Sequence, residues 1–208
     1  MASKMIIGNQ VLGLLGVTEM IADLDNPTND AEKQLNLWWD DAVKEILERH
    51  DWKFARGYAA LASTTAPSKE YVYAYQLPVN CLAPRYLWDV DAEARITEYE
   101  YEISGQMICT DLEEAYLAYT KNNPVVGNFP PHFVKILRFL LAGYLAPKFG
   151  DRAGKSEDML EQYEKALRKA IEIDCEPNNY PDTEGDQWLS AGGYASSSES
   201  VDDDWLAE

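Results

Sequence analysis

Cysteine is scarce in this 208-residue chain, and what there is does not form a pattern. The three cysteines, Cys81, Cys109 and Cys175, are far apart, and no two of them make a C-x-x-C pair. An odd number of widely spaced cysteines argues against a disulfide framework. We therefore expect three small core residues in a protein that is made in a reducing cytosol.

The sequence also lacks the signatures of metal, nucleotide and nucleophilic sites. His50 and His132 have no H-E-x-x-H or similar spacing, and there is no G-x-S-x-G, P-loop or G-x-G-x-x-G motif. We interpret His50 as a helix C-terminal residue that interacts with the helix dipole, and His132 as a structural residue at a helix start. The sequence therefore predicts that the protein is not an enzyme and holds no cofactor and no metal.

Long hydrophobic runs and basic residues are scarce as well. The longest uncharged apolar run, 139–147, is too short to cross a bilayer, and no signal peptide is recognisable, so we expect a soluble protein with no membrane partner. Only 18 basic residues stand against 36 acidic ones, which gives a formal charge of -18. Such a field repels phosphate backbones, so we do not expect sequence-specific DNA binding. It would suit a surface along which DNA slides without sticking.

Apolar residues make up 46% of the chain, and their spacing changes twice. A short apolar helix is predicted over 6–16, and Asn29 with Glu32 forms a capping pair that opens an amphipathic helix ending near Arg49. From 52 to about 119 the period becomes two. The strand candidates are 52–61, 71–77, 85–90, 96–103, 106–110 and 115–120, with a hairpin turn at Ser104-Gly105. We expect Trp52, Phe54, Tyr73 and Tyr75 to form a core between the sheet and the helices.

Two further helices are predicted after the strands. Pro130-Pro131 opens a helix that is apolar nearly all round and that Pro147 and Gly150 end, and an amphipathic helix follows over 152–174. The predicted fold is α+β: a helical bundle of about four helices with an inserted small antiparallel β-sheet domain and an extended C-terminal tail. The expected parts are the first helices (1–51), the β domain (52–128), the closing helices (129–175) and the acidic tail (176–208).

The tail has an unusual composition. Nine of its 33 residues are acidic, no basic residue follows Lys169, and aromatic residues are spaced along it. Such a segment cannot build its own core. It is either a solubilising end or a strap that folds on a partner, and we favour the strap because tryptophan is enriched at interface anchors. The candidate contact residues are Tyr180, Trp188, Leu189, Tyr194, Trp205 and Leu206.

A ladder of carboxylates is the second candidate surface. Glu98, Glu100 and Glu102 alternate with apolar residues, so they project from one face of the expected strand. A solvated strand face is one interpretation. In an assembly of several copies, the same ladder could line a channel or mark a subunit edge.

The order of several blocks resembles a known family. A helix runs into a W-x-F-A block (residues 52–55), and Tyr71-Val72-Tyr73-Ala74-Tyr75 leads into an L-P-x-N-C-L block (residues 77–82). Further matches are 105–111 and 129–133, then Leu145-Ala146-Pro147 and Tyr163-x-x-Ala166-Leu167-x-x-Ala170. Over about 5–177, this order is similar to that of the head-to-tail adaptors of short-tailed bacteriophages, the tail tubular protein A or gatekeeper family. Two features depart from the family: Asn80 stands where aspartate is common, and the tail is rich in serine and aspartate.

The resemblance implies a structural virion protein in the phage neck, made in the host cytoplasm. Twelve copies would form a ring between the portal protein and the tail nozzle (tail tubular protein B type) and extend the DNA channel, through which DNA passes without specific binding. The tail would contact the portal. Because like-charged copies repel one another, we expect the free protein to be monomeric at low salt and to assemble on the portal.

Two other functions stay open. The chain could be an acidic inhibitor that mimics DNA and occupies a nucleic-acid enzyme, which would require carboxylates over one continuous face. Less favoured is a tail-associated peptidoglycan hydrolase, for which a carboxylate pair is needed; Glu113 and Glu114 are adjacent candidates.

Overall fold

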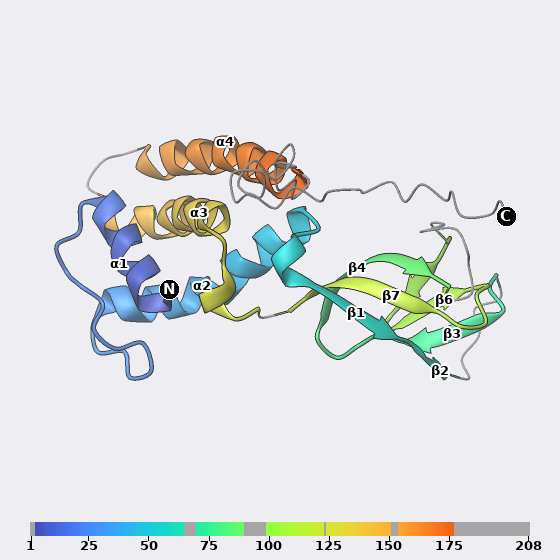
Figure 1. Cartoon of the computed structure of the whole chain (residues 1–208). Helices are drawn as coiled ribbons and strands as arrows, with labels where there is room; N and C mark the ends of the chain where they lie inside the picture. Colours follow the sequence, from blue (N-terminus) through green and yellow to red (C-terminus); the bar gives the residue numbers. More distant parts are fainter. Residues whose placement is uncertain (1–2, 65–69, 90–98, 123, 151–153, 177–208) are drawn as a thin grey trace, which may run out of the picture. The chain divides into compact units, whose positions relative to one another are not determined.

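The computed structural model describes residues 3–64, 70–89, 99–122, 124–150 and 154–176 (Figure 1). The chain divides into two compact units, Met1–Asp174 and Cys175–Glu208. The described residues of the first unit form four α-helices and two small antiparallel sheets, so the α+β class is confirmed. Strands and helices are segregated along the chain: two helices, then the strands, then two helices.

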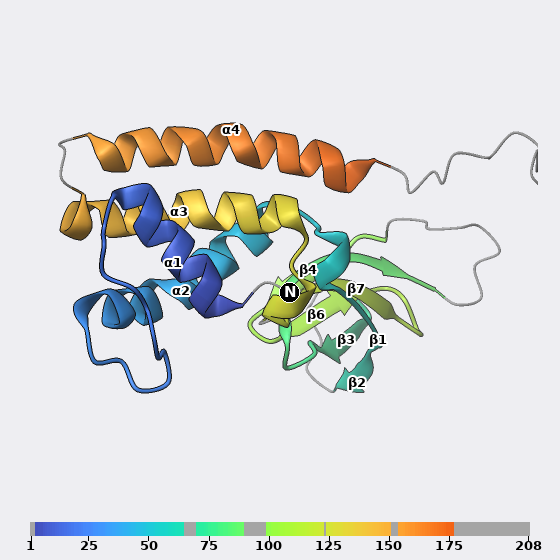
Figure 2. The ribbon, with the colours of Figure 1, turned by 60° about the vertical axis from the view of Figure 1, so that its left-hand side comes forward.

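The first two helices begin at side-chain caps. In α1 (Lys4–Leu15) the Ser3 hydroxyl accepts a hydrogen bond from the amide of Ile6, and the helix ends at Gly16, whose φ of 81° is left-handed. In α2 (Asp30–Arg49) the side chain of Asn29 and that of Glu32 form a complete capping box, which confirms the predicted pair. Figure 2 shows α1 lying against α3. Gly8 of α1 faces α2 instead, where a Cβ would lie 2.4 Å from Cδ2 of Leu35.

The last two helices are α3 (Pro131–Phe149) and α4 (Lys155–Cys175). The prediction that Pro147 ends α3 is wrong, because the helix continues through it to Phe149. Proline at 147 has no N–H to donate to the carbonyl of Gly143. That carbonyl accepts instead from the hydroxyl of Ser156 in α4, at 2.8 Å, so the proline leaves no unpaired group there.

The strands form two sheets rather than the single sheet expected. The first has the order β1-β7-β4, from Arg56–Ala60, Tyr116–Lys121 and Cys81–Trp88. The second has the order β2-β3-β6-β5, from Ala62–Thr64, Tyr73–Gln76, Met107–Thr110 and Glu102–Ser104. All pairings are antiparallel.

The predicted strand 52–61 is shorter than expected, and the residues that follow it join a different sheet. Its first part is a 3-10 turn, Lys53–Ala55, and only 56–60 pairs with β7. The amide of Leu61 then bonds to the carbonyl of Ala115. After Leu61 the chain continues as β2, which pairs with β3 in the second sheet. Strand β4 starts four residues earlier than predicted, with register shifts around Pro84, because proline cannot donate to a ladder. The hairpin at Ser104-Gly105 is confirmed, with Gly105 at a φ of 63°.

The two regions have separate cores. The helical core contains Trp52, which is fully buried, and Phe54 packs against it. The strand core contains Tyr75, with Tyr73 packed against it. The expectation that these four aromatic residues share one core is therefore wrong, because Trp52 and Phe54 precede β1 and turn toward α3, where they contact the ring of Phe133.

Candidate interaction surfaces

Four carboxylates lie near Tyr71, two residues before β3; we call this group the carboxylate patch. Its members are Glu70, Glu100, Glu102 and Asp111. The pKa of the Tyr71 phenol is raised, first by burial and then by these four negative charges, because each of them disfavours a phenolate. The amide of Val72 donates to Oδ1 of Asp111 at 3.0 Å, which fixes one carboxylate beside the strand.

The predicted ladder of Glu98, Glu100 and Glu102 is only partly reproduced. Glu98 lies outside the described residues, and Glu100 and Glu102 are both exposed, as expected of a solvated or subunit-edge position. However, only Glu102 is in a strand, because β6 ends at Thr110, and the hydroxyl of Thr110 bonds to the carbonyl of Glu100. Within the described residues the strand therefore begins later than the expected 96–103, and the face of three carboxylates stays a prediction.

Sequence reasoning missed Glu70 and Asp111. Glu70 precedes β3 and Asp111 follows β6, and the pairing of Tyr73 with Thr110 brings these two strand ends together. The sequence does place Glu70 just before the strand candidate 71–77 and Asp111 just after the candidate 106–110. Only the pairing of these two strands, which the sequence did not reveal, shows that the two acidic residues lie close together.

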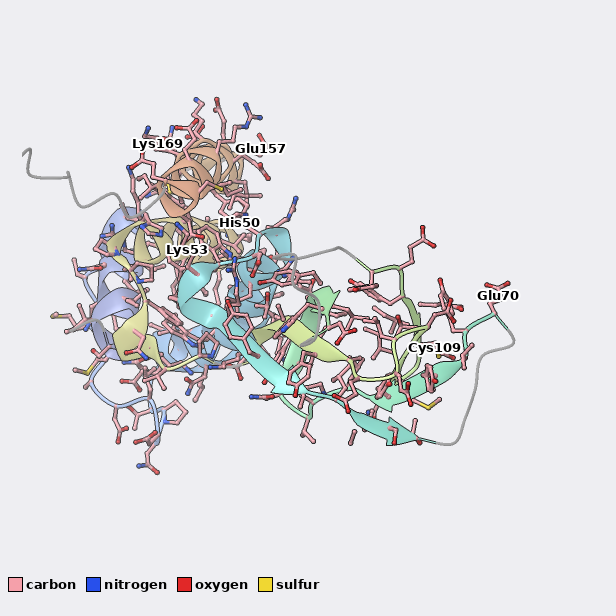
Figure 3. All side chains as sticks on the ribbon, turned by 45° about the vertical axis from the view of Figure 1, so that its right-hand side comes forward. His50, Lys53, Glu70, Cys109, Glu157 and Lys169 are labelled. Atoms are coloured by element: carbon pink, nitrogen blue, oxygen red, sulfur yellow. The ribbon has the colours of Figure 1, made fainter. Side chains whose placement is uncertain are left out.

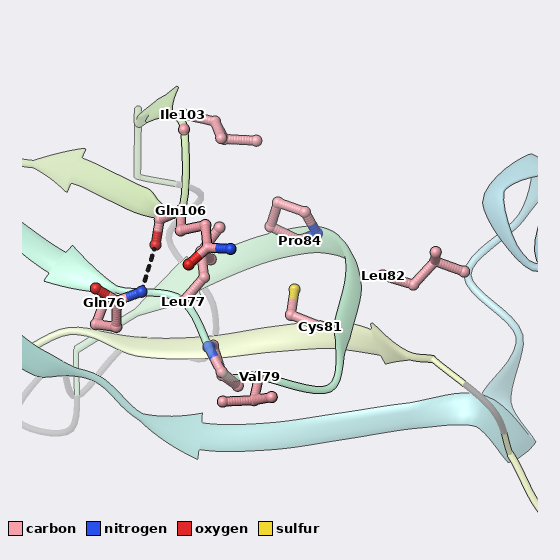
Figure 4. A pocket seen from close by; sticks show the side chains of 10 residues that line it. Gln76, Leu77, Val79, Cys81, Leu82, Pro84, Ile103 and Gln106 are labelled. Atoms are coloured by element: carbon pink, nitrogen blue, oxygen red, sulfur yellow. Dashed lines mark hydrogen bonds between the residues drawn. The ribbon is translucent and has the colours of Figure 1, made fainter.

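An apolar hollow of about 360 Å³ lies between β4 and the β5–β6 turn (Figure 4). The amide of Leu77 donates to the carbonyl of Gln106 at 2.9 Å across one end of it. Burial raises the pKa of the Cys81 thiol, which keeps the thiol protonated and weakly nucleophilic. The hollow is lined by Gln76, Leu77, Pro78, Val79, Cys81, Leu82, Pro84, Ile103, Gly105 and Gln106.

The adjacent acids Glu113 and Glu114 line a second, open hollow of about 290 Å³ together with Ser63 and Tyr75. Both glutamates are exposed. The hydroxyl of Tyr75 bonds to the backbone carbonyls of Leu112 and Glu113, at 2.7 and 2.6 Å, so it is committed to holding this turn. The side chains provide negative charge at a shallow surface.

Both histidines of the chain converge on one buried carboxylate. Nε2 of His50, the C-cap of α2, lies 3.1 Å from Oδ2 of Asp174, and the amide of Lys53 donates to the same oxygen at 3.2 Å. Nε2 of His132 is 4.0 Å from Oδ1 and has no hydrogen-bond partner, while its ring stacks on Trp52. Burial lowers the pKa of His132, and the charge of Asp174 opposes that shift. His50 and Lys53 are labelled in Figure 3.

The predicted position of both histidines at helix ends is confirmed, but their partner was not foreseen. Asp174 is 124 residues from His50 in the chain, so no local pattern could indicate the contact. The three side chains join the ends of α2, α3 and α4. Arg85 of β4 adds a link to the strands, because its guanidinium donates to the carbonyls of Leu47 and His50.

The predicted tail contacts lie outside the described residues, namely Tyr180, Trp188, Leu189, Tyr194, Trp205 and Leu206. Over the described ranges, His, Cys, Asp and Glu side chains do not gather into a group of three that could hold a metal ion. Among the described helices, none combines the length and apolarity needed to cross a membrane.

No protein-family model matches the sequence, and no curated protein matches it.

Proposed function

We propose that this protein is a structural virion component, a head-to-tail adaptor that forms a ring between the portal and the tail nozzle and extends the DNA channel. The observation that carries the proposal is the order of the elements. The strands between Arg56 and Lys121 follow a pair of helices and precede a second pair, as the adaptor resemblance implies. The W-x-F-A block occupies the junction of α2 and β1, and the L-P-x-N-C-L block leads into β4.

The charge of the molecule supports the same function. A formal charge of -18 on each copy gives a ring that DNA would not bind tightly, because phosphates and carboxylates repel. The carboxylate patch would face the channel or the edge of a subunit. In either position it contributes negative charge without a cofactor or a reacting group.

Binding to a portal ring from the same genome tests the proposal. The full-length chain is mixed with that ring, and the bound copies are counted by native mass spectrometry. We expect twelve copies, and we expect binding to be lost when the residues after Glu176 are deleted. A matched control replaces the nine acidic residues of the tail by their amides and leaves the aromatic residues in place. If the aromatic anchors carry the contact, this control still binds.

Failure of the full-length chain to bind the portal would reject the adaptor function. Binding that survives the deletion would keep the adaptor function and reject the strap.

A second candidate has one structural observation in its favour. The carboxylate patch brings four acidic side chains together on a surface where the described residues 62–64, 70–76 and 102–110 include no lysine or arginine. A DNA-mimic inhibitor requires such a surface. A salt-sensitive complex with a basic DNA-binding enzyme, weakened by Glu100→Gln with Glu102→Gln, would favour it over the adaptor.

A further inference from the structure

Charge is segregated between two surfaces of the described chain. Helices α1 and α3 contain no aspartate or glutamate, although the chain has 36 acidic residues. Their charged side chains are all basic: Lys4, Lys135, Arg138 and Lys148. These two packed helices are thus a positive layer in a strongly negative protein.

One face of this layer combines basic and exposed apolar side chains; we call it the basic face. Nη1 of Arg138 lies 3.3 Å from Oε1 of Gln10, which joins the outer surfaces of the two helices. Ile6 and Leu14 lie one turn on either side of Gln10 and are 46% and 39% exposed. Lys135 is three residues from Arg138 and is exposed, so it lies on the same side of α3. We do not count Lys148 as part of the basic face, because its Nζ pairs with Oδ2 of Asp30 at 3.0 Å.

The carboxylate patch has the complementary character. Glu100, Glu102 and Asp111 supply negative charge, and the described strands of that sheet, at 62–64, 73–76, 102–104 and 107–110, contain no lysine or arginine. An apolar side chain is exposed beside them: Val72, which follows Tyr71 and bonds through its amide to Asp111, is 68% exposed. A surface of this kind fits lysine and arginine around a small apolar centre.

We propose that the basic face of one copy binds the carboxylate patch of a second copy of this chain. Two chains of charge -18 repel wherever acidic surfaces meet, so a contact that places the positive layer of one copy against an acidic surface of the other is favoured. Because the two surfaces differ, the contact is heterologous and repeats from copy to copy, as in a ring or a filament. This inference deepens the proposed function by naming the surfaces through which the ring assembles.

The test measures self-association of the full-length protein without portal, so it is independent of the adaptor test. Sedimentation is followed up to about 1 mM protein, at about 0.15 M salt, where long-range repulsion is screened beyond roughly 8 Å. We expect association that increases with concentration. Reversing the basic face, by Lys135→Glu with Arg138→Glu, should weaken it about tenfold or more, because close attraction becomes repulsion.

The chain offers a matched control in α4. Lys165→Glu with Arg168→Glu reverses a lysine and an arginine three residues apart on an exposed helix face, with the same change in net charge. It should leave association within about twofold of the native value, because those residues lie outside both surfaces. Circular dichroism checks that each variant is folded.

Complementation separates a contact from a general charge effect. Reversing the carboxylate patch, by Glu100→Lys with Glu102→Lys, should also abolish association. An equimolar mixture of the two reversed variants should associate again, because each reversed surface then meets its new complement.

Four outcomes would overturn the proposal: a native protein that stays monomeric throughout, reversals without effect, a control that weakens association as strongly, or a mixture that stays dissociated. A basic-face variant that loses portal binding but keeps self-association would assign the face to the portal instead. Complementation in a protein that does not bind the portal would keep the contact and reject the adaptor function.

Discussion

At the residue scale, Glu32 organises the segment between α1 and α2. The side chain is 1% exposed, and its carboxylate accepts hydrogen bonds from four backbone amides, those of Ala22, Asp23, Thr28 and Asn29. These bonds favour the charged form and lower the pKa of Glu32 from 4.5 to about 2. The Glu32 carboxylate therefore holds the segment between α1 and α2, which has no helix or strand of its own.

We predict a stability loss in acid that depends on Glu32. Because its pKa is lower in the folded state, its contribution is complete above pH 4.5 and is lost as the pH falls toward about 2. Glu32→Gln should lower the free energy of unfolding at pH 7 and flatten its decline below pH 4.5. Urea unfolding between pH 7 and pH 2 measures this. The control is Glu48→Gln, an exposed residue of the same helix, and an equal effect of both variants would contradict the prediction.

Asp174 carries the second prediction at this scale. Its side chain is 7% exposed and accepts hydrogen bonds from His50 and from the amide of Lys53. Asp174→Asn should cost about 1–3 kcal/mol of unfolding free energy, because buried donors lose a charged acceptor. It should also lower the pKa of His132 further, since the charge that opposes the burial shift is removed.

Urea unfolding and an NMR titration of the two imidazoles check these outcomes. The control is Glu172→Gln, which removes an exposed ion pair with Lys169 in the last turns of the same helix. A rise in the pKa of His132 in the Asp174 variant would contradict the electrostatic explanation.

At the element scale, the end of α3 depends on α4. Pro147 leaves the carbonyl of Gly143 without an intrahelical donor, and Ser156 supplies one. The two helices are close at this point, because a Cβ on Gly143 would lie 2.7 Å from Cδ2 of Leu160. A proline that would otherwise weaken the last turn of a helix is thereby accommodated.

We predict energetic coupling between Pro147 and Ser156. Ser156→Ala should cost about 1 kcal/mol in the native background, because the Gly143 carbonyl loses its partner. In a Pro147→Ala background the same change should cost less, since the alanine amide can bond to that carbonyl. A double-mutant cycle in urea gives the coupling. Additive effects of the two substitutions would contradict the prediction.

At the scale of the whole molecule, net charge governs assembly. Copies of charge -18 repel over a Debye length of about 30 Å at 0.01 M salt. We predict that the free protein is monomeric at low salt, where repulsion outweighs the contact between copies, and that binding to the portal offsets this repulsion. Light scattering of the free protein at an ionic strength of about 0.01 M checks whether it is monomeric. A dodecamer that forms readily there without portal would contradict it.

The local pattern of the sequence predicted most of the elements. Both capped helices, the two closing helices and the hairpin at Gly105 follow from signals within a few residues, such as Asn29 with Glu32. The errors occurred where a distant partner decides. Pro147 does not end α3 because Ser156 satisfies Gly143. Residues 52–61 divide because Lys53–Ala55 forms a 3-10 turn and only 56–60 finds a partner in β7.

The sequence by itself determined the α+β class, the excess of acidic charge and the helix boundaries set by caps, since these depend on composition and on neighbours along the chain. Only the tertiary structure decided the convergence of His50 and His132 on Asp174, the grouping of Glu70 and Asp111 with Glu100 and Glu102, and the pairing of Gln10 with Arg138. These contacts join residues far apart in the chain. Their geometry is set by strand register and helix packing, which no local pattern specifies.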